Sequence, residues 1–397
     1  MKKIILMVLS IIILLVLGLF LYIYLGSTSK LVDKAELENP NFLKDKMAVI
    51  YFSTTADQDL DGMGVSYGVF IDQDGQAKGL KMQGLEVGNL AKSKDKLFLE
   101  EKNKVRLLGN GYQEFPMEKY QHTGVLSGYI ERENIFFSIY NSGFSQNGYN
   151  SDVRYGNEKG FYTDTIPYYI ESSGLIDDRI YLLTSDDDNT NDQSKFALKE
   201  VSFDDKLQVK QLTNIESENG LAPVSPVLAD KDYYYIIMAQ YQDGFNGKVS
   251  LIRVNKQSYA QDMFTLINYK DMDDINKTLI MNSNRSAYIY EKELYFVDGL
   301  GDVYTFHSET KEIKKKFSFK EFNQSLLRYD QEISFNGDSL YFFRYNPAIK
   351  KHFIEKYELK TGKLEKQVKI TGIPEILLER KLNLKSLSPY DFLIVND

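Results

Sequence analysis

Residues 292–306 read KELYFVDGLGDVYTF, which is the pattern of a β-hairpin. The runs Leu294–Val297 and Val303–Phe306 consist mostly of aromatic and β-branched residues, which favour strands. Between them, the Asp-Gly and Gly-Asp pairs of residues 298–302 supply the positive φ angles that a tight hairpin turn needs. Residues 308–313 then predict a second turn that leads to an outer strand.

The beginning of this hairpin recurs along the chain as one or two polar residues followed by a short apolar and aromatic strand. The seven copies begin their apolar runs at Leu97, Ile135, Ile180, Tyr233, Leu294, Leu340 and Phe392. Repeats of roughly 40 to 50 residues with several strands each are typical of β-propellers. We therefore predict an all-β fold, a seven-bladed β-propeller.

The two ends of the repeated region fit a closed ring. The first strands after the N-terminal segment, Ala48–Ser53 and Tyr67–Asp72, have no copy of the repeat before them. If they share a sheet with Phe392–Val395 near the C-terminus, the ring closes and no strand edge is left unpaired at the junction. This closure predicts seven blades, whereas eight blades follow if the N-terminal strands form a blade of their own.

The repeat resembles that of the quinoprotein-like (PQQ-like repeat) β-propellers, in which two strands around a Gly turn are followed by Thr-Gly-Lys. Residues 361–363 are Thr-Gly-Lys, and residues 310–312 are Thr-Lys-Glu, with lysine in the place of glycine. The resemblance extends over residues 294–313 and 340–364. The docking tryptophan that usually ends the family's repeat is absent, and so is the vicinal cysteine pair of its cofactor-dependent enzymes, since the chain has no Trp and no Cys. The resemblance therefore implies the propeller fold and a non-catalytic binding platform at a bacterial envelope.

The N-terminal segment Ile4–Leu25 is apolar apart from Ser10 and Gly18. At about 1.5 Å per residue, a helix of this length spans roughly 33 Å, enough for a bilayer core of about 30 Å. Lys2 and Lys3 precede the segment, and positive flanks stay in the cytoplasm. The sequence thus predicts a transmembrane helix that carries the rest of the chain outside the cytoplasm.

These observations divide the chain into four parts. We expect a cytoplasmic N-terminus at residues 1–3, a transmembrane signal anchor at 4–25, a linker at 26–44 and a β-propeller at 45–397. The protein would then be a single-pass protein of the cell membrane with its C-terminal body at the bacterial cell surface. A cleaved signal peptide stays open as an alternative, because Ser27 and Ser29 form a small-x-small pattern.

Composition and the absence of known motifs exclude several classes of function. The chain has 48 Lys and Arg against 56 Asp and Glu, a net charge of −8, so no nucleic-acid partner is expected. The three histidines, His122, His307 and His352, lie far apart in the sequence. The chain has no Gly-x-Ser-x-Gly nucleophile elbow, no His-Glu-x-x-His zinc-binding motif and no phosphate-binding glycine loop. The sequence does not decide whether the protein is an enzyme, although it favours a non-enzyme. The alternative is a glycosidase-like envelope hydrolase with paired carboxylates near the propeller axis.

One short motif suggests a metal. Asp57, Asp59 and Asp61 alternate before Gly62, and alternate carboxylates in such a loop aim oxygens at a hard cation such as calcium. Two later positions that are acidic in calcium loops are Val65 and Gly68 here. The sequence therefore leaves open a calcium site and a solvated polar loop, and it predicts no other cofactor.

Two segments resemble recognition loops. Residues 141–163 and 241–247 combine Tyr and Phe with Gly, Asn and Ser, a composition that suits adaptable binding surfaces. Long loops in compact domains are also frequently functional. The candidate binding residues are Phe144, Tyr149, Tyr155, Tyr241 and Phe245. We therefore predict a membrane-anchored binding or scaffold module for a protein or glycan of the cell envelope.

Overall fold

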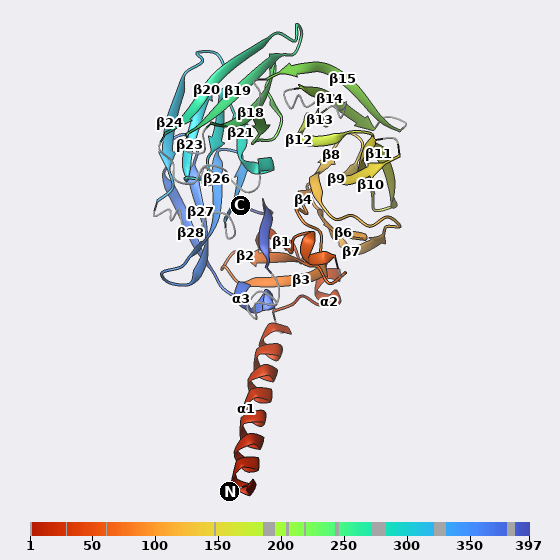
Figure 1. Ribbon diagram of the computed structural model, residues 1–397, viewed down its shortest axis with the longest axis vertical. Helices are drawn as coiled ribbons and strands as arrows, with labels where there is room; N and C mark the ends of the chain where they lie inside the picture. The colour runs from red at the N-terminus through yellow and green to blue at the C-terminus, as the bar shows by residue number, and fades with distance from the viewer. Residues whose placement is uncertain are drawn as a thin grey trace.

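The fold is a ring of seven antiparallel sheets from which one long helix extends as a stem (Figure 1). It is seen in a computed structural model. The structure describes residues 2–28, 30–60, 62–146, 148–185, 195–203, 206–217, 220–242, 246–270, 283–320, 331–378 and 386–397. The protein is thus a seven-bladed β-propeller, as the spacing of the repeat predicts.

Each blade is a meander that starts at the ring axis and ends at the rim. Blade 1 consists of β29 (Ser388–Ile394), β1 (Lys46–Ser53), β2 (Val65–Asp72) and β3 (Ala77–Gln83). Blade 2 consists of β4 (Leu90–Lys92), β5 (Leu97–Glu101), β6 (Lys104–Gly109) and β7 (Gly111–Pro116). Blade 3 consists of β8 (Gly124–Ile130), β9 (Ile135–Ser145), β10 (Gly148–Asn157) and β11 (Gly160–Ile166). Blade 4 consists of β12 (Tyr169–Ile176), β13 (Arg179–Ser185), β14 (Lys195–Phe203) and β15 (Leu207–Glu216).

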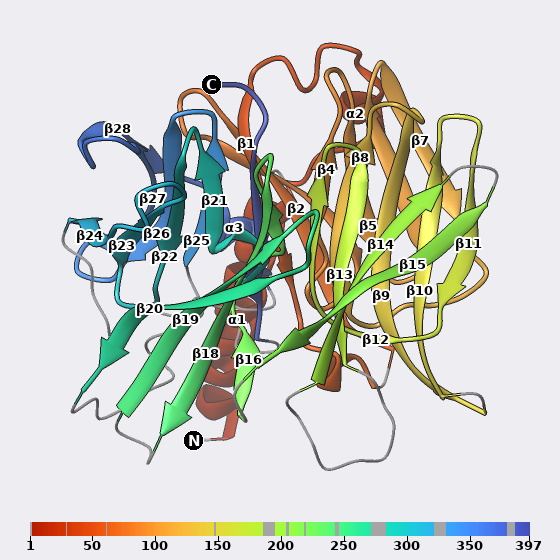
Figure 2. The same cartoon turned by 90° about the horizontal axis from the view of Figure 1, so that it is seen from above.

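The remaining three blades follow the same plan. Blade 5 consists of β16 (Leu221–Pro223), β17 (Leu228–Ala229), β18 (Tyr233–Gln242), β19 (Asn246–Asn255) and β20 (Gln261–Tyr269). Blade 6 consists of β21 (Ala287–Tyr290), β22 (Glu293–Val297), β23 (Asp302–His307) and β24 (Ile313–Ser318). Blade 7 consists of β25 (Gln331–Asn336), β26 (Ser339–Asn346), β27 (Lys351–Glu358) and β28 (Leu364–Ile370). Figure 2 shows the strands of blades 3 and 4 along their length.

The two faces of the ring differ in the connections they carry. We call the face at which the inner strands begin the N-face, and the opposite face the C-face. Because neighbouring strands are antiparallel, the N-face carries the connections between blades and the loops from the second to the third strand of each blade. The C-face carries the two remaining turns of each blade.

The ring closes through the C-terminal strand, as predicted. Strand β29 pairs with β1 in an antiparallel register that places Phe392 opposite Ile50 and Leu393 opposite Val49. Six of the seven copies of the repeat are second strands of blades 2 to 7, whereas the copy at Phe392 is the inner strand of blade 1. The interpretation of that last copy as one more equivalent strand was therefore wrong, although the blade count is right.

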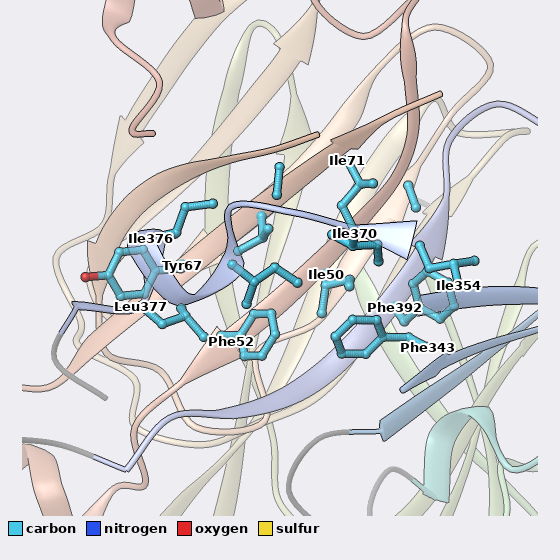
Figure 3. Packing of buried hydrophobic residues seen from close by; sticks show 14 of the residues in the cluster. Ile50, Phe52, Tyr67, Ile71, Phe343, Ile354, Ile370, Ile376, Leu377 and Phe392 are labelled. Carbon is cyan, nitrogen blue, oxygen red and sulfur yellow. The ribbon is translucent and has the colours of Figure 1, made fainter. Parts of the chain in front are cut away.

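Aromatic and aliphatic side chains fill the space between blades. Between blades 7 and 1, the ring of Phe343 lies edge-on to that of Phe52, with centroids 6.1 Å apart, and 6.2 Å from the ring of Phe392 (Figure 3). All three side chains are buried, together with Ile50 and Ile354. Burial of one large apolar side chain contributes about 1.5 to 3 kcal/mol, so these contacts stabilise the closing seam without a tryptophan.

The turns of the repeat explain the partial match at residues 310–312. In the turn between β27 and β28, Gly362 has φ +68°, and its amide donates to the carbonyl of Glu358 at 2.8 Å. In the corresponding turn between β23 and β24, Lys311 has φ +61° and its amide donates to the carbonyl of His307 at 2.9 Å. Lysine thus adopts the left-handed conformation that glycine adopts more readily.

Three α-helices accompany the ring in the described residues. Helix α1 (Lys2–Thr28) forms the stem, α2 (Lys34–Glu38) is capped by Asp33, and α3 (Ile373–Ile376) packs against blade 1. Side chains of α1 are described at position 7 and from 9 to 21, and the large apolar ones among them are exposed. In the part of the chain that the structure describes, no helix is long and apolar enough to cross a membrane.

Candidate functional site

A central channel runs along the axis of the ring. It encloses a cavity of about 340 Å³, and every blade contributes to its wall. One wall residue from each blade, in chain order, is Leu90, Ser127, Ser173, Leu228, Tyr288, Phe335 and Leu393. The wall combines apolar side chains with polar ones, and the polar groups determine what the channel can bind.

The main polar feature of the channel is an ion pair between Arg285 and Asp391. Arg285 ends the short 3₁₀-helix η3 (Ser283–Arg285), and its Nε and Nη2 donate to the two carboxylate oxygens of Asp391 at 2.8 and 3.1 Å. The amides of Leu90 and Phe392 also donate to Asp391, at 2.7 and 2.8 Å. Each carboxylate oxygen therefore accepts two hydrogen bonds, and the pair joins blades 6, 1 and 2.

The neighbouring residue extends this contact to a fourth blade. Asn284 Nδ2 donates to the main-chain carbonyl of Val125, which immediately precedes the described wall residues of blade 3. Helix η3 thus lies across the channel at the N-face. Asp391 is fully buried and accepts from four donors, so it connects the strands that meet at the channel.

A second buried carboxylate, Glu100, lies behind the channel wall. Its Oε1 accepts from the amide of Asn89 at 2.9 Å and from Ser127 Oγ at 3.1 Å, while its Oε2 accepts from the hydroxyl of Tyr140. Burial raises the pKa of Glu100 even though these hydrogen bonds lower it. Glu100 therefore connects the wall of blade 3 to the second strand of blade 2.

Arg154 holds the loops of the N-face. It is fully buried on β10, and its Nη atoms donate to the main-chain carbonyls of Glu101, Lys102 and Lys119 at 3.0, 2.9 and 2.7 Å. Its guanidinium also lies over the ring of Tyr140, 4.9 Å from the centroid. One side chain therefore fixes the turn between β5 and β6 and the connection from blade 2 to blade 3.

Two ion pairs lie on the N-face above Arg154. Lys102 pairs with Asp59, and Lys119 Nζ lies 2.6 Å from a carboxylate oxygen of Asp152. Both carboxylates and Lys102 are buried, whereas the side chain of Lys119 is exposed. The side chains of Lys119 and Gln121 donate to Asp152, and these hydrogen bonds outweigh burial and lower its pKa. The polar part of this face is therefore neutral and fixed in position.

Exposed or half-buried apolar and aromatic side chains lie on the loops and hairpin tips of the same face, and we call them together the N-face patch. It consists of Leu60, Met63, Tyr120, Phe144, Tyr149 and Tyr169. Leu60 is 87% exposed and Phe144 is 77% exposed, although both are large apolar side chains. Tyr149 stands edge-on between Phe144 and Tyr169, with centroids 5.0 and 4.9 Å apart. The patch extends from the loop between β1 and β2 to the inner strand of blade 4.

The predicted binding residues fall in different places. Phe144 and Tyr149 face each other across the tip of the β9–β10 hairpin and belong to the N-face patch. Tyr155 instead lies within β10 and packs against Phe203 of blade 4, with centroids 4.9 Å apart. The backbone of Tyr241 belongs to β18, but its side chain lies outside the described residues, as does Phe245.

The expectation of a long loop at residues 141–163 was wrong. These residues complete β9, form β10 and begin β11, with paired registers on both sides. Tyr155 and its neighbour across the ladder, Tyr162, are therefore strand residues. Glycine and asparagine at the hairpin tip gave the segment the composition of a loop.

Two of the three carboxylates of the possible calcium loop lie in the described residues. Asp57 and Asp59 belong to η1 (Asp57–Asp59), whereas Asp61 lies outside the described residues. Asp59 Oδ1 accepts from the amide of Gly64 at 2.7 Å, and Asp59 also pairs with Lys102. Among the described residues, no group of three His, Cys, Asp or Glu side chains is placed to hold a metal ion. Calcium binding stays a prediction.

Comparison with known proteins identifies a family. Residues 41–395 match the family described as the YycP β-propeller domain. The uncharacterised protein YycP of Bacillus subtilis (strain 168) is 32% identical over 364 residues, which cover 91% of this chain and 92% of that protein.

Solved structures share the fold at low sequence identity. A puromycin-hydrolysing peptidase of Mycobacterium tuberculosis superposes with a TM-score of 0.51 at 8% identity, covering 85% of this chain and 55% of that one. The periplasmic gluconolactonase PpgL of Pseudomonas aeruginosa has a TM-score of 0.48 at 10% identity, covering 88% and 99% of the two chains. At such identities the likeness describes the fold alone.

Proposed function

The chain belongs to the YycP β-propeller family, and we propose that it serves as a membrane-anchored, extracytoplasmic binding module that holds a protein of the cell envelope on its N-face patch. The observation that carries the proposal is the group of exposed apolar side chains on that patch. Leu60, Phe144 and Tyr120 would be withdrawn from water by a partner, and aromatic anchors of this kind dominate binding energy once they are buried.

The chemistry of the patch favours a protein over a glycan. Sugar rings stack on flat aromatic faces, whereas Leu60 and Met63 present branched or flexible aliphatic surface. Lys119 is 54% exposed and pairs with the buried Asp152, so a charged group lies on the same face as the apolar side chains, as at protein interfaces that combine apolar and polar contacts. Arg154 holds the main chain of Lys102 and Lys119 in place before a partner arrives, which lowers the entropy lost on binding.

The anchor is proposed from the sequence of α1 and its surroundings. Residues 4–25 are almost entirely apolar, and the helix extends away from the ring (Figure 1), with its described large apolar side chains exposed. Exposed apolar side chains such as Leu14 and Leu15 would be stabilised by a lipid surrounding. With Lys2 and Lys3 before the helix, the ring would lie outside the cytoplasm.

No specific observation favours the hydrolase alternative. The channel carboxylate Asp391 is held by Arg285 and two amides, and Glu100 is buried behind the wall. Glycoside hydrolysis by paired carboxylates needs both groups to face the scissile bond. We therefore propose the binding role alone.

The test uses the full chain in its own membranes. Cells expressing a tagged chain are treated with a membrane-permeant cross-linker, and proteins recovered with Phe144→Ser combined with Leu60→Ser are compared with those recovered with the parent. Tyr162→Ser is the matched control, because Tyr162 is 68% exposed on β11, away from the patch. We expect the double variant to lose the partner and the control to keep it. Equal recovery by all three chains would contradict the proposal.

A further inference from the structure

A second hollow lies on the C-face, between blades 1 and 2 and opposite the N-face patch. Its volume is about 320 Å³, and we call it the C-face pocket. Its wall is formed by the end of the linker at residues 40–44, the β4–β5 turn at 93–96, the β6–β7 turn at 109–110 and the C-terminal residues 395–396. The pocket is therefore built from segments that the ring closure brings together.

The pocket concentrates positive charge in an acidic protein. Lys44, Lys92, Lys94 and Lys96 line it, against a single lining carboxylate, Asp95. Lys96 Nζ pairs with Glu158 at 3.0 Å, and Asp95 accepts from Ser93 Oγ and Asn110 Nδ2, both at 3.3 Å. Within the described residues, no ion pair involves Lys44, Lys92 or Lys94.

Lys92 is held at the boundary between the pocket and the channel. Its Nζ donates to the main-chain carbonyls of Ile394 and Val395 at 2.7 and 3.2 Å, and the residue lines both cavities. Desolvation lowers its pKa, as expected for an ammonium group without a carboxylate partner. A nearby anion would reverse this effect by favouring the charged form.

The charge balance indicates which anion fits. Four lysines line the pocket. Glu158 neutralises Lys96 and Asp95 neutralises one more lysine, so a net charge of +2 is left in the pocket. A phosphate monoester carries a charge of about −1.5 to −2 at neutral pH and offers three strong acceptor oxygens. Lysine ammonium groups bind phosphate as point charges. The half-buried apolar side chains of Leu43 and Val395 beside them would contact the carbon portion of an ester.

We propose that the C-face pocket binds a phosphate monoester, with Lys44, Lys92 and Lys94 around the phosphate group. This site is separate from the N-face patch, so it goes beyond the proposed protein-binding role. The ester could be a soluble metabolite or the headgroup of a lipid such as phosphatidic acid, since both present the same group.

The test is a calorimetric titration of the full chain in neutral detergent micelles with sn-glycerol 3-phosphate. We expect saturable binding by the parent chain. Lys44→Glu combined with Lys94→Glu should weaken it by at least about tenfold, which corresponds to about 1.4 kcal/mol. Both lysines are exposed, so folding should be retained, and an unchanged melting temperature of the variant verifies this. Lys210→Glu, on the outer strand β15, is the matched control and should bind like the parent.

A second arm separates the two sources of the group. The titration is repeated in micelles that contain phosphatidic acid. An unchanged affinity for glycerol 3-phosphate supports a soluble ester, and a reduced affinity that is restored with phosphatidylcholine in place of phosphatidic acid supports the lipid headgroup. Absence of saturable binding, or equal binding by the parent and the double variant, would overturn the proposal.

Discussion

Arg154 is expected to be the most sensitive single position of the N-face. Replacement by methionine keeps a side chain of similar length but removes the donors to the carbonyls of Glu101, Lys102 and Lys119. A buried polar group that loses its partner costs about 1 to 3 kcal/mol, and breaking a buried charged contact costs about 3 to 5 kcal/mol in total. We expect Arg154→Met to lower the free energy of unfolding by about 3 to 5 kcal/mol.

Because the ring is large, this loss of unfolding free energy corresponds to a modest decrease in melting temperature. The entropy of unfolding is about 2.1 cal/mol/K per residue, or roughly 0.75 kcal/mol/K for the residues from 41 to 395. The melting temperature should therefore fall by about 4 to 7 °C. Differential scanning calorimetry of the full chain in detergent measures this shift.

The control for this experiment is the same substitution at an exposed arginine. Arg132→Met removes a side chain that pairs with Glu133 at the surface, where substitutions usually change stability by less than about 0.5 kcal/mol. If Arg154→Met melts within about 1 °C of the parent, as Arg132→Met should, Arg154 does not hold the loops of the N-face.

Three further predictions follow from the fold. Deleting residues 390–397 removes most of β29 and should lower the free energy of unfolding by more than about 5 kcal/mol, because several large buried side chains are lost; unchanged chemical denaturation would contradict ring closure. Partial burial raises the pKa of Glu114, but hydrogen bonds from Lys104 and Tyr112 outweigh it and lower the pKa to about 2. The stabilisation from ionised Glu114 is therefore present above its ordinary pKa of about 4.5 and is lost as the pH falls towards 2. In urea titrations, the difference in free energy of unfolding between the parent and Glu114→Gln should shrink over that pH range. A difference that stays constant would refute this prediction. Calcium bound by the loop that contains Asp57 and Asp59 should raise the melting temperature of the full chain, and Asp57→Asn should abolish the rise; an unchanged melting temperature of the parent with calcium would establish a polar loop instead.

The architecture was predictable because its signals are local. The spacing of the repeat and the Asp-Gly turn near Gly299 identify the hairpins, and the unmatched strands at the two ends indicate how the ring closes. Even the replacement of glycine by Lys311 did not hide the repeat, since lysine adopts the same left-handed turn. The turns depend on neighbours within a few residues, whereas the closure was inferred from the two ends of the repeated region.

The contacts that build the candidate sites depend on distant partners. Arg285 and Asp391 are 106 residues apart, and Arg154 and Lys102 are 52 residues apart. No local pattern distinguishes these arginines from exposed ones. Residues 141–163 were interpreted as a loop from their Gly and Asn content, although pairing among the second, third and fourth strands of blade 3 overrides that preference. Leu60 was not recognised because one leucine in an acidic loop does not indicate exposure.

The central claim is that a protein partner covers the N-face patch, and site-specific photo-cross-linking tests it most directly. A photoreactive phenylalanine analogue is placed at position 144 of the full chain, or at position 162 as the control, and living cells are irradiated before purification. Both side chains are largely exposed, so the two positions differ mainly in the face they occupy. We predict a discrete, protease-sensitive adduct from position 144 that is absent from position 162. No adduct from position 144, the same adducts from both positions, or a protease-resistant glycan adduct would contradict the account.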